Sequence, residues 1–153
     1  KELIIIDDTC LECNGKLDKY GDHAVVCKYG TGIIYRHDLV VLGISNLLKQ
    51  ADIKHAIELR HLFRNNNMKP ADIYIENWND NGGSAAIDVG ITSVTRDSIL
   101  NDSSIKLLSA ANNFHQSKLN KYRKYVEDNQ INTFGLSYQP LIIEAYGGFH
   151  KES

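Results

Sequence analysis

The chain has 153 residues, enough for one domain, or one domain with a small appendage, and for a substantial hydrophobic core. Its formal net charge of −2 and pI of about 6.3 neither indicate nor exclude a nucleic-acid partner, because local basic patches can bind phosphate. No apolar run approaches the roughly 18 residues of a membrane span, and no signal peptide is visible. We therefore expect no membrane partner and an intracellular, reducing location, nuclear or cytoplasmic. Because residue 1 is Lys, we also expect a piece of a larger polyprotein with flanking domains.

Residues 1–37 are predicted to form a module around the three cysteines of the chain. Cys10, Cys13, His23 and Cys27 follow the spacing Cys-x2-Cys-x9-His-x3-Cys. Three thiolates and an imidazole are soft ligands that suit a tetrahedral structural zinc, and so short a segment has little other core on which to fold. His37 is an alternative to His23 as a ligand, and it could equally contact a phosphate or simply pack. The competing interpretations are three buried thiols, or one disulfide with a thiol left over.

The remaining residues, 38–153, are predicted to form the main domain. Asp38 has the character of a helix N-cap, and the apolar residues after it recur at broadly helical spacing up to Gln50. Residues 53–59 then alternate between apolar and polar, as in a short strand that ends near Glu58. The domain is thus expected to begin with a helix followed by a strand.

Residues 69–93 are predicted to form a β-hairpin with one aspartate on each strand. Two strand-forming runs flank the turn sequence Asn-Asp-Asn-Gly-Gly. If the turn centres on residue 80 or 81, antiparallel pairing places Asp72 and Asp88 on one face as opposite or diagonal neighbours. Two carboxylates that close repel each other unless a cation lies between them, and a divalent metal is the usual one. The alternative is that each aspartate ends its strand and faces water.

A long helix is predicted from about residue 104 to residue 128. At about 100° per residue its apolar stripe is roughly 80° wide, and Lys118 falls in the middle of the stripe. Lys121 sits on the rim and Lys124 well away from it. A lysine inside the stripe points at the sheet and needs anionic partners, unless it extends past the helix into solvent. A last strand is predicted over residues 138–146.

The predicted order after the cysteine module is α, β, β, β, α, β, with acidic residues on successive strands and a lysine on the following helix. This arrangement resembles the PD-(D/E)XK nuclease superfamily. More narrowly, the chain resembles the restriction-like endonuclease domain of site-specific non-LTR retrotransposons and related copies, over about residues 10–147. The motifs that carry the likeness are the Cys/His module, Lys69-Pro-Ala-Asp72, Ile87-Asp88-Val89, Ala111-x6-Lys118-x2-Lys121-Tyr122 and Pro140-Leu-Ile-Ile-Glu-Ala-Tyr-Gly147.

Three features depart from the pattern of the superfamily. The third strand has Asp88-Val89-Gly90 where acid-x-Lys is usual, Ala71 separates Pro70 from Asp72, and the spacing of the zinc ligands is its own. In the retrotransposon branch the lysine is thought to have moved to the long helix. An inward-facing Lys118 fits that hypothesis.

The resemblance implies an αβββαβ restriction-endonuclease-like core that hydrolyses DNA phosphodiesters with Mg²⁺ or Mn²⁺. These hard cations prefer oxygen ligands, and four are implied: Asp72, Asp88, the backbone carbonyl of Val89 and Glu58. Lys118, or Lys121 as second choice, would orient the attacking water or stabilise the charge that develops on the phosphorus. Zinc would be structural, because a site closed by four protein ligands has no position for substrate.

DNA is the expected partner, and the candidate phosphate contacts are basic residues, each of which is equally a solvated surface charge: Arg36, His37, Arg60, Arg64 and Lys124. The nuclease would be the nicking domain of a mobile element. One alternative is a branched-DNA (Holliday-junction-type) resolvase of the same superfamily, which would need a homodimer to cut two strands. Others are a catalytically inactive nuclease fold that binds nucleic acid or protein, and an unrelated small α/β enzyme.

Overall fold

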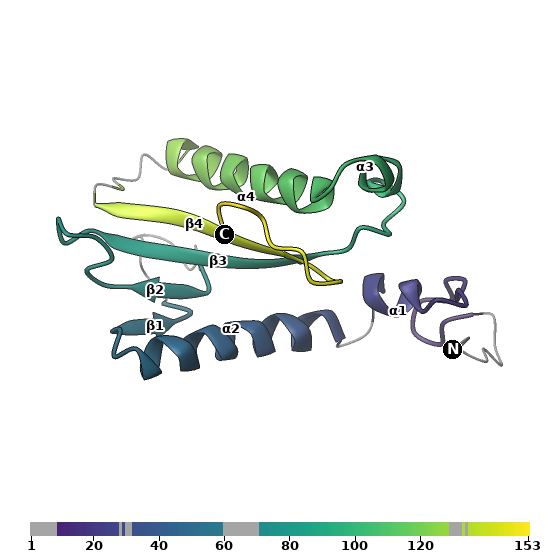
Figure 1. Cartoon of the computed structure of the whole chain (residues 1–153), viewed down its shortest axis with the longest axis horizontal. Helices are drawn as coiled ribbons and strands as arrows, with labels where there is room; N and C mark the ends of the chain where they lie inside the picture. The colour runs from purple at the N-terminus through teal and green to yellow at the C-terminus, as the bar shows by residue number, and fades with distance from the viewer. Residues whose placement is uncertain (1–8, 28, 30–31, 60–70, 129–132, 134) are drawn as a thin grey trace.

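A four-stranded sheet with one long helix on each face forms the main body of the chain (Figure 1). This computed structural model describes residues 9–27, 29, 32–59, 71–128, 133 and 135–153. The elements in chain order are α1 (Asp22–Val26), α2 (Gly32–Gln50), β1 (His55–Ile57), β2 (Ile73–Ile75), β3 (Ser84–Thr92), α3 (Leu100–Ile105), α4 (Ser109–Asp128) and β4 (Leu136–Glu144). Apart from the short α1 and α3, this is the predicted order of helices and strands.

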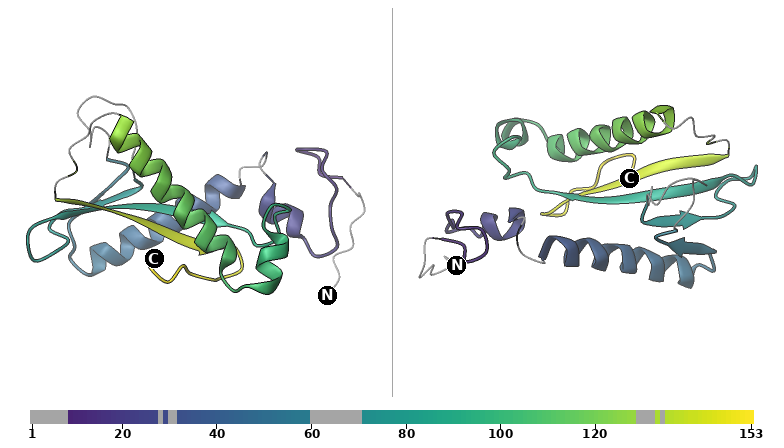
Figure 2. Two further views of the ribbon diagram at one scale, coloured as in Figure 1. Left: turned by 90° about the horizontal axis from the view of Figure 1, so that it is seen from above. Right: turned by 180° about the vertical axis from the view of Figure 1, so that it is seen from behind.

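The sheet is mixed, with strand order β1-β2-β3-β4. β1, β2 and β3 pair antiparallel, whereas β3 and β4 run parallel over their full length. Parallel neighbours need a crossover connection, and α3 and α4 supply it on one face of the sheet. Figure 2 shows α4 on this face and α2 on the opposite face. β3 is therefore covered on both sides.

The hairpin between β2 and β3 has its predicted centre. Ile73 pairs with Ile87 and Ile75 with Ala85, so the register centres on residue 80. Gly82 has φ +74°, a conformation that glycine adopts without strain, within the turn that joins the strands. Asp72 lies just before β2, and its N–H donates to the Ile87 carbonyl at 2.9 Å, so the register of the ladder does not extend unchanged to Asp72 and Asp88.

The core on the α2 face consists of apolar side chains from three elements: Val41 of α2, Ile73 and Ile75 of β2, and Ala85 and Val89 of β3. On the other face α4 lies very close to β3 at Gly90. A Cβ atom at this position would lie 2.7 Å from Ile142 Cδ1, 2.8 Å from Phe114 Cε1 and 3.0 Å from Lys118 Cε. Because Gly90 has no side chain, the Lys118 side chain can lie against β3 at this position and reach Asp88 and Val89.

α2 begins at Gly32, six residues earlier than predicted. Asp38 is thus not an N-cap, and the domain boundary expected between residues 37 and 38 falls inside this helix. The guanidinium of Arg36 donates to Gly32 O at 3.3 Å and to Val25 O at 2.8 Å, which joins the first turn of α2 to α1. The run before Asp38 contains no proline to stop a helix, so this tertiary contact can extend α2 toward the N-terminus.

The predicted helix over residues 104–128 is two helices, because the chain turns between α3 and α4. Leu108 has φ +58°, which a leucine adopts only under tertiary constraint, and this residue interrupts the helix. The N–H of Ala111 donates to Glu144 Oε1 at 3.1 Å, so a buried carboxylate from the end of β4 caps the new helix start. The capping group is remote in sequence, which explains why local patterns predict one helix.

The first and last predicted strands are shifted or shortened. The strand expected over residues 53–59 is confined to β1, and the strand expected over residues 138–146 begins two residues earlier, as β4. Arg60, Arg64 and the start of the predicted hairpin segment lie outside the described residues. In the ranges given above, neither α2 nor α4 nor any shorter helix has both the length and the apolar character of a membrane span.

Candidate functional site

The four predicted zinc ligands lie together. One ligand atom from each of Cys10, Cys13, His23 and Cys27 falls within 4.8 Å of all the others. Cys10 Sγ and Cys27 Sγ are 3.9 Å apart, and Cys13 Sγ and His23 Nε2 are 3.2 Å apart. The first distance is far longer than a disulfide of about 2.05 Å, but it matches the roughly 3.8 Å sulfur–sulfur edge of a tetrahedron with Zn–S bonds of about 2.3 Å. The Cys/His cluster could bind a metal such as zinc.

Local hydrogen bonds and a glycine shape this cluster. The carboxylate of Asp18 accepts the N–H groups of His23 at 2.7 Å and Asp22 at 3.0 Å, and these donors hold the pKa of Asp18 below its usual value. A Cβ at Gly15 would lie 2.8 Å from the ring of His23 and 3.0 Å from Cys13 Sγ. The N–H groups of Cys13 and Glu12 lower the pKa of the Cys10 thiol to about 6. At Cys10 the thiolate, the form that binds metals, is thus favoured, whereas the neighbouring Cys10 and Cys27 help to raise the pKa of the Cys13 thiol.

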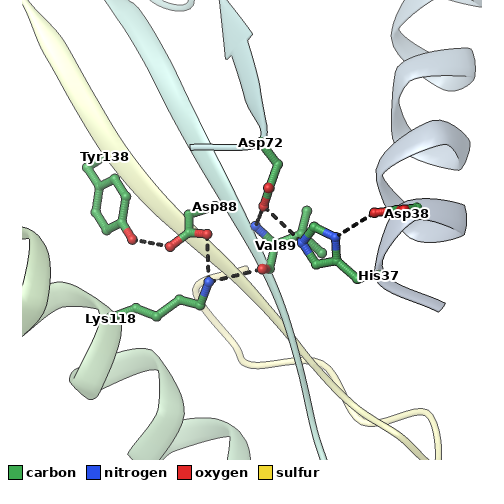
Figure 3. A network of polar contacts seen from close by, with 7 residues as sticks. All are labelled: His37, Asp38, Asp72, Asp88, Val89, Lys118 and Tyr138. Atoms are coloured by element: carbon green, nitrogen blue, oxygen red, sulfur yellow. Dashed lines mark hydrogen bonds and ion pairs between the residues drawn. The ribbon is translucent and has the colours of Figure 1, made fainter. Parts of the chain in front are cut away.

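The second group of predicted site residues meets where β2 begins. β2 begins only at Ile73, and the N–H and C=O of Val89 bond to side chains instead of to that strand. Asp72 Oδ2 accepts the Val89 N–H at 2.7 Å, and the Lys118 ammonium donates to the Val89 carbonyl at 3.0 Å (Figure 3). The backbone of one residue thus connects the acid before β2 with a lysine from α4.

Lys118 also forms an ion pair with Asp88. Its Nζ lies 2.6 Å from Asp88 Oδ1, and the side chains are 18 % and 21 % exposed. Lys118 therefore turns inward as its position in the apolar stripe predicts, whereas Lys121 and Lys124 are exposed on the surface of α4. The Lys118 ammonium holds the two oxygens, Asp88 Oδ1 and Val89 O, that the sequence assigned to a divalent cation.

Tyr138 completes the surroundings of Asp88, and sequence reasoning missed it. Its hydroxyl donates a short hydrogen bond to Asp88 Oδ2, and its ring stacks on Tyr122 with centroids 4.0 Å apart. Burial, together with the charge of Asp88, raises the pKa of Tyr138 far above its ordinary value, so the hydroxyl remains a donor. The one signal that could have found it is the parallel register, in which Tyr138 pairs with Ala86, two residues from Asp88 and on the same face.

His37 lies against Asp72 instead of the cysteines. Its Nε2 is 3.2 Å from Asp72 Oδ2 and its Nδ1 is 3.2 Å from Asp38 Oδ1. Since carboxylates only accept, the protonated ring satisfies both contacts at once. Burial raises the pKa of Asp72, opposed by the His37 charge and by the Val89 N–H, and the charge of Asp88 raises it further. A cation near Asp72 would relieve both of the effects that raise this pKa.

The fourth predicted oxygen ligand, Glu58, lines the same hollow as Asp72. This hollow has a volume of about 250 Å³, and His37, Asp38 and Leu42 line it as well. The N–H of Glu58 donates to the backbone carbonyl of Asp72 at 2.7 Å, so the end of β1 lies beside the start of β2. The carboxylates of Asp72 and Asp88 have different partners, His37 of α2 and Lys118 of α4.

A further group of potential metal ligands, which the sequence did not indicate, lies near the C-terminus. His115, His150 and Glu152 each offer an atom within 4.8 Å of the others. The two imidazole rings are stacked at 3.9 Å with an angle of 12° between them, so their in-plane lone pairs run nearly parallel and cannot meet at one ion. Burial and the neighbouring His150 lower the pKa of His115. The stack fastens the C-terminal segment to α4 and is a packing contact.

The described residues thus define a mixed α/β protein with a four-stranded sheet, a Cys/His cluster able to bind a metal such as zinc, and an acid–lysine cluster on the central strand. No family model matches the chain, and no match is found among the curated proteins or the solved structures.

Proposed function

We propose that this chain is a divalent-metal-dependent DNA endonuclease, and that it serves as the nicking domain of a mobile element. The observation that carries the proposal is the position of the Lys118 ammonium, which is shared between Asp88 Oδ1 and the Val89 carbonyl beside the point that Asp72 reaches. Oxygens of the kind that bind cations thus lie close to a positively charged donor beside β3. The resemblance of the sequence to restriction-like endonucleases supports the same function.

The oxygen atoms at this point suit the proposed cation. Two carboxylates, Asp72 and Asp88, and one backbone carbonyl are hard donors of the kind that Mg²⁺ and Mn²⁺ prefer. The thiolates of the Cys/His cluster suit zinc, so the two kinds of site separate by ligand chemistry. When bound, Mg²⁺ or Mn²⁺ would polarise the scissile phosphate and lower the pKa of water. Glu58 borders the hollow beside Asp72 and is the candidate for a further ligand.

The protein's own groups then orient the reactants. An ammonium has three N–H bonds, and Lys118 uses two of them for Asp88 and Val89. The third, and any N–H that a bound cation would displace from those oxygens, can donate to a phosphate oxygen or to the attacking water, where it would stabilise the charge that develops during attack. Hydrolysis joins the water oxygen to phosphorus and releases the bridging oxygen as a hydroxyl group. His37 keeps the Asp72 carboxylate in place from the side of α2.

A junction-resolving enzyme is the second candidate, and one surface favours it. α2 exposes an apolar stripe of Tyr35, Leu39 and Leu42, which are 64 %, 49 % and 52 % exposed. Contiguous exposed apolar side chains are typical of contact sites between proteins. Since one active site cuts one strand, a homodimer through this stripe would place two sites on one branched substrate.

Cleavage of labelled DNA tests the proposal. Zinc-loaded wild type, Asp88→Asn and the control Asp80→Asn are incubated with duplex, single-stranded and four-way-junction DNA in Mg²⁺ or Mn²⁺ at low salt. Asp80 is exposed in the hairpin turn, so its variant removes a carboxylate without touching the site. We expect wild type and Asp80→Asn to cut and Asp88→Asn not to cut. Nicked duplex would indicate the mobile-element enzyme, and symmetric cuts at the junction would indicate the resolvase. Binding without any cutting by wild type would refute the endonuclease and leave a nucleic-acid-binding module.

A further inference from the structure

A second hollow, of about 140 Å³, lies at the junction between α1 and the main domain. Two arginines from different elements line it, Arg36 of α2 and Arg96 of the segment after β3. Its other walls include Val25 of α1, Thr92 of β3 and Phe114 of α4. We call it the arginine hollow. The sequence predicts Arg36 as a phosphate contact but gives no sign of Arg96.

Neither arginine is neutralised within the described part of the chain. Arg36 donates to the carbonyl oxygens of Val25 and Gly32, and Arg96 donates to Thr92 Oγ1 at 2.9 Å. All three acceptors are uncharged, and no described carboxylate forms an ion pair with either guanidinium. Each guanidinium has five N–H donors, so most of its hydrogen-bonding capacity remains for a ligand. Two positive charges beside one small hollow are a site for an anion.

The arginine hollow lies next to the acid–lysine cluster. Phe114 lines the hollow, and its ring centroid is 5.5 Å from Lys118 Nζ. Along β3, Thr92 is three residues beyond Val89, a distance of about 10 Å at roughly 3.3 Å per residue. Adjacent phosphates of one strand lie several ångströms apart, so about 10 Å is the separation of nearby phosphates on the same strand. A strand that is cut beside Lys118 would thus bring another of its phosphates to the arginines.

We propose that Arg36 and Arg96 together bind a backbone phosphodiester group of the substrate strand, a few nucleotides from the bond that is cut. This inference rests on the proposed endonuclease function and gives the direction of the strand, along β3 toward the Cys/His module. Arginine forks bind phosphate oxygens in pairs, and the two side chains approach from different elements. Because Val25 of α1 holds Arg36, the Cys/His module forms one wall of the substrate groove.

DNA binding without cleavage tests this subsite. Zinc-loaded protein is titrated with fluorescent duplex DNA in the absence of Mg²⁺ and Mn²⁺ over a range of salt concentrations. Arg96→Gln is compared with Arg123→Gln, a control that removes an exposed arginine on α4, outside the arginine hollow. We choose Arg96 because loss of Arg36 would also loosen α1. We expect Arg96→Gln to weaken binding about tenfold at low salt, and to reduce the slope of log K against log salt by about one unit.

A second measurement locates the phosphate. Single methylphosphonates, which lack the phosphate charge, are introduced at successive positions on either side of the cleavage point. For wild type we expect one position, a few nucleotides from the cut, to weaken binding, and for Arg96→Gln, which keeps Arg36, we expect a smaller loss at that position. If Arg96→Gln and Arg123→Gln behave alike, or if both proteins respond equally to every methylphosphonate, the subsite is refuted while cleavage by wild type still supports the endonuclease. If wild type neither binds nor cuts DNA, both proposals fail.

Discussion

Lys118 and Asp88 are 30 positions apart in the chain, and their charged groups meet at 2.6 Å under α4, each side chain about four-fifths buried. The ammonium simultaneously holds the Val89 carbonyl. In the protein without metal, the lysine therefore satisfies the oxygens that a divalent cation would take. Lysine and metal ion stabilise the same carboxylate, and this relationship can be measured through stability as well as through activity.

Replacing Lys118 by methionine should abolish cleavage and make the fold dependent on divalent metal. Removing one member of a buried ion pair leaves an uncompensated charge, so we expect a loss of about 3 kcal/mol in the free energy of unfolding without metal. Mg²⁺ should then raise the melting temperature of Lys118→Met more than that of wild type. Lys49→Met, on the exposed side of α2, is the control. An equal response to Mg²⁺ in all three proteins would show that Asp88 does not bind the ion.

Tyr138→Phe should weaken metal binding while leaving the ring stacked on Tyr122. The lost hydroxyl frees one oxygen of Asp88 to rotate, and loss of such supporting hydrogen bonds typically lowers metal affinity at least tenfold. We expect the Mg²⁺ concentration for half-maximal cleavage to rise about tenfold, with near-normal cleavage at saturating Mg²⁺. Tyr74→Phe removes a hydroxyl hydrogen bond to Ser84 of similar kind, away from the site. A comparable metal requirement for both variants would assign Tyr138 to packing alone.

Asp72→Asn should change how stability depends on pH. Burial raises the pKa of Asp72 in the folded state above its ordinary value of 3.8, so the folded state favours the protonated carboxyl. Its contribution to stability is complete below pH 3.8 and is lost as the pH rises through the folded pKa. The uncharged amide of Asp72→Asn can still accept from Val89. Urea unfolding without metal should therefore show the variant gaining stability relative to wild type as the pH rises to neutrality, although it cannot cleave DNA. A constant difference across pH would contradict the raised pKa.

Gly90→Ala should separate α4 from β3. The added Cβ would come within 3.0 Å of Ile142, Phe114 and Lys118, and overpacking of this kind costs about 1–3 kcal/mol. We expect lower stability and impaired cleavage together, because the Lys118 chain is displaced. Gly43→Ala is the matched control, since nothing lies within 4 Å of its added Cβ in α2. That substitution should raise stability by up to about 1 kcal/mol. Both are read by thermal unfolding, and a stable, active Gly90→Ala would contradict the close approach.

Loss of zinc should affect DNA binding as well as folding. Cys13→Ser removes one of the four ligands. The zinc content, measured by atomic absorption spectroscopy, and the thermal stability should therefore fall together. Hydrogen bonds join α1 to the main domain. The guanidinium of Arg36 donates to the Val25 carbonyl, and the Tyr146 hydroxyl donates to Asp22 at 2.5 Å. The variant should therefore also show the weaker, less salt-dependent DNA binding expected of Arg96→Gln. If the Cys13→Ser protein kept its full zinc content and normal stability, the Cys/His cluster would not be the zinc site.

Local patterns predicted those parts of the molecule that local physics determines. The hairpin centre follows from alternation and turn residues, and the inward position of Lys118 follows from helical periodicity. The Cys/His spacing likewise predicted a cluster that the fold brings together. Each of these depends on residues within about 20 positions of one another in the chain.

The missed features depend on contacts between remote segments. Tyr138 reaches Asp88 through a parallel register that no local pattern fixes, and His37 reaches Asp72 because α2 starts early. The break before α4 relies on a leucine in a left-handed conformation, which sequence rules assign to glycine or asparagine. Arg96 belongs to an irregular segment whose direction is set by the end of β3.

The late start of β2, at Ile73, has a consequence for how this protein tolerates substitutions. The Val89 side chain is buried against α2, while its backbone N–H contacts Asp72 and its backbone carbonyl contacts Lys118. Every amino acid carries that carbonyl, and every one except proline carries that N–H. Which side chains are tolerated at position 89 would thus depend only on how they pack in the core. The backbone hydrogen bonds to Asp72 and Lys118 would remain in every variant except proline. An alanine scan would register a core valine there, whereas Val89→Pro would remove the hydrogen bond that holds Asp72.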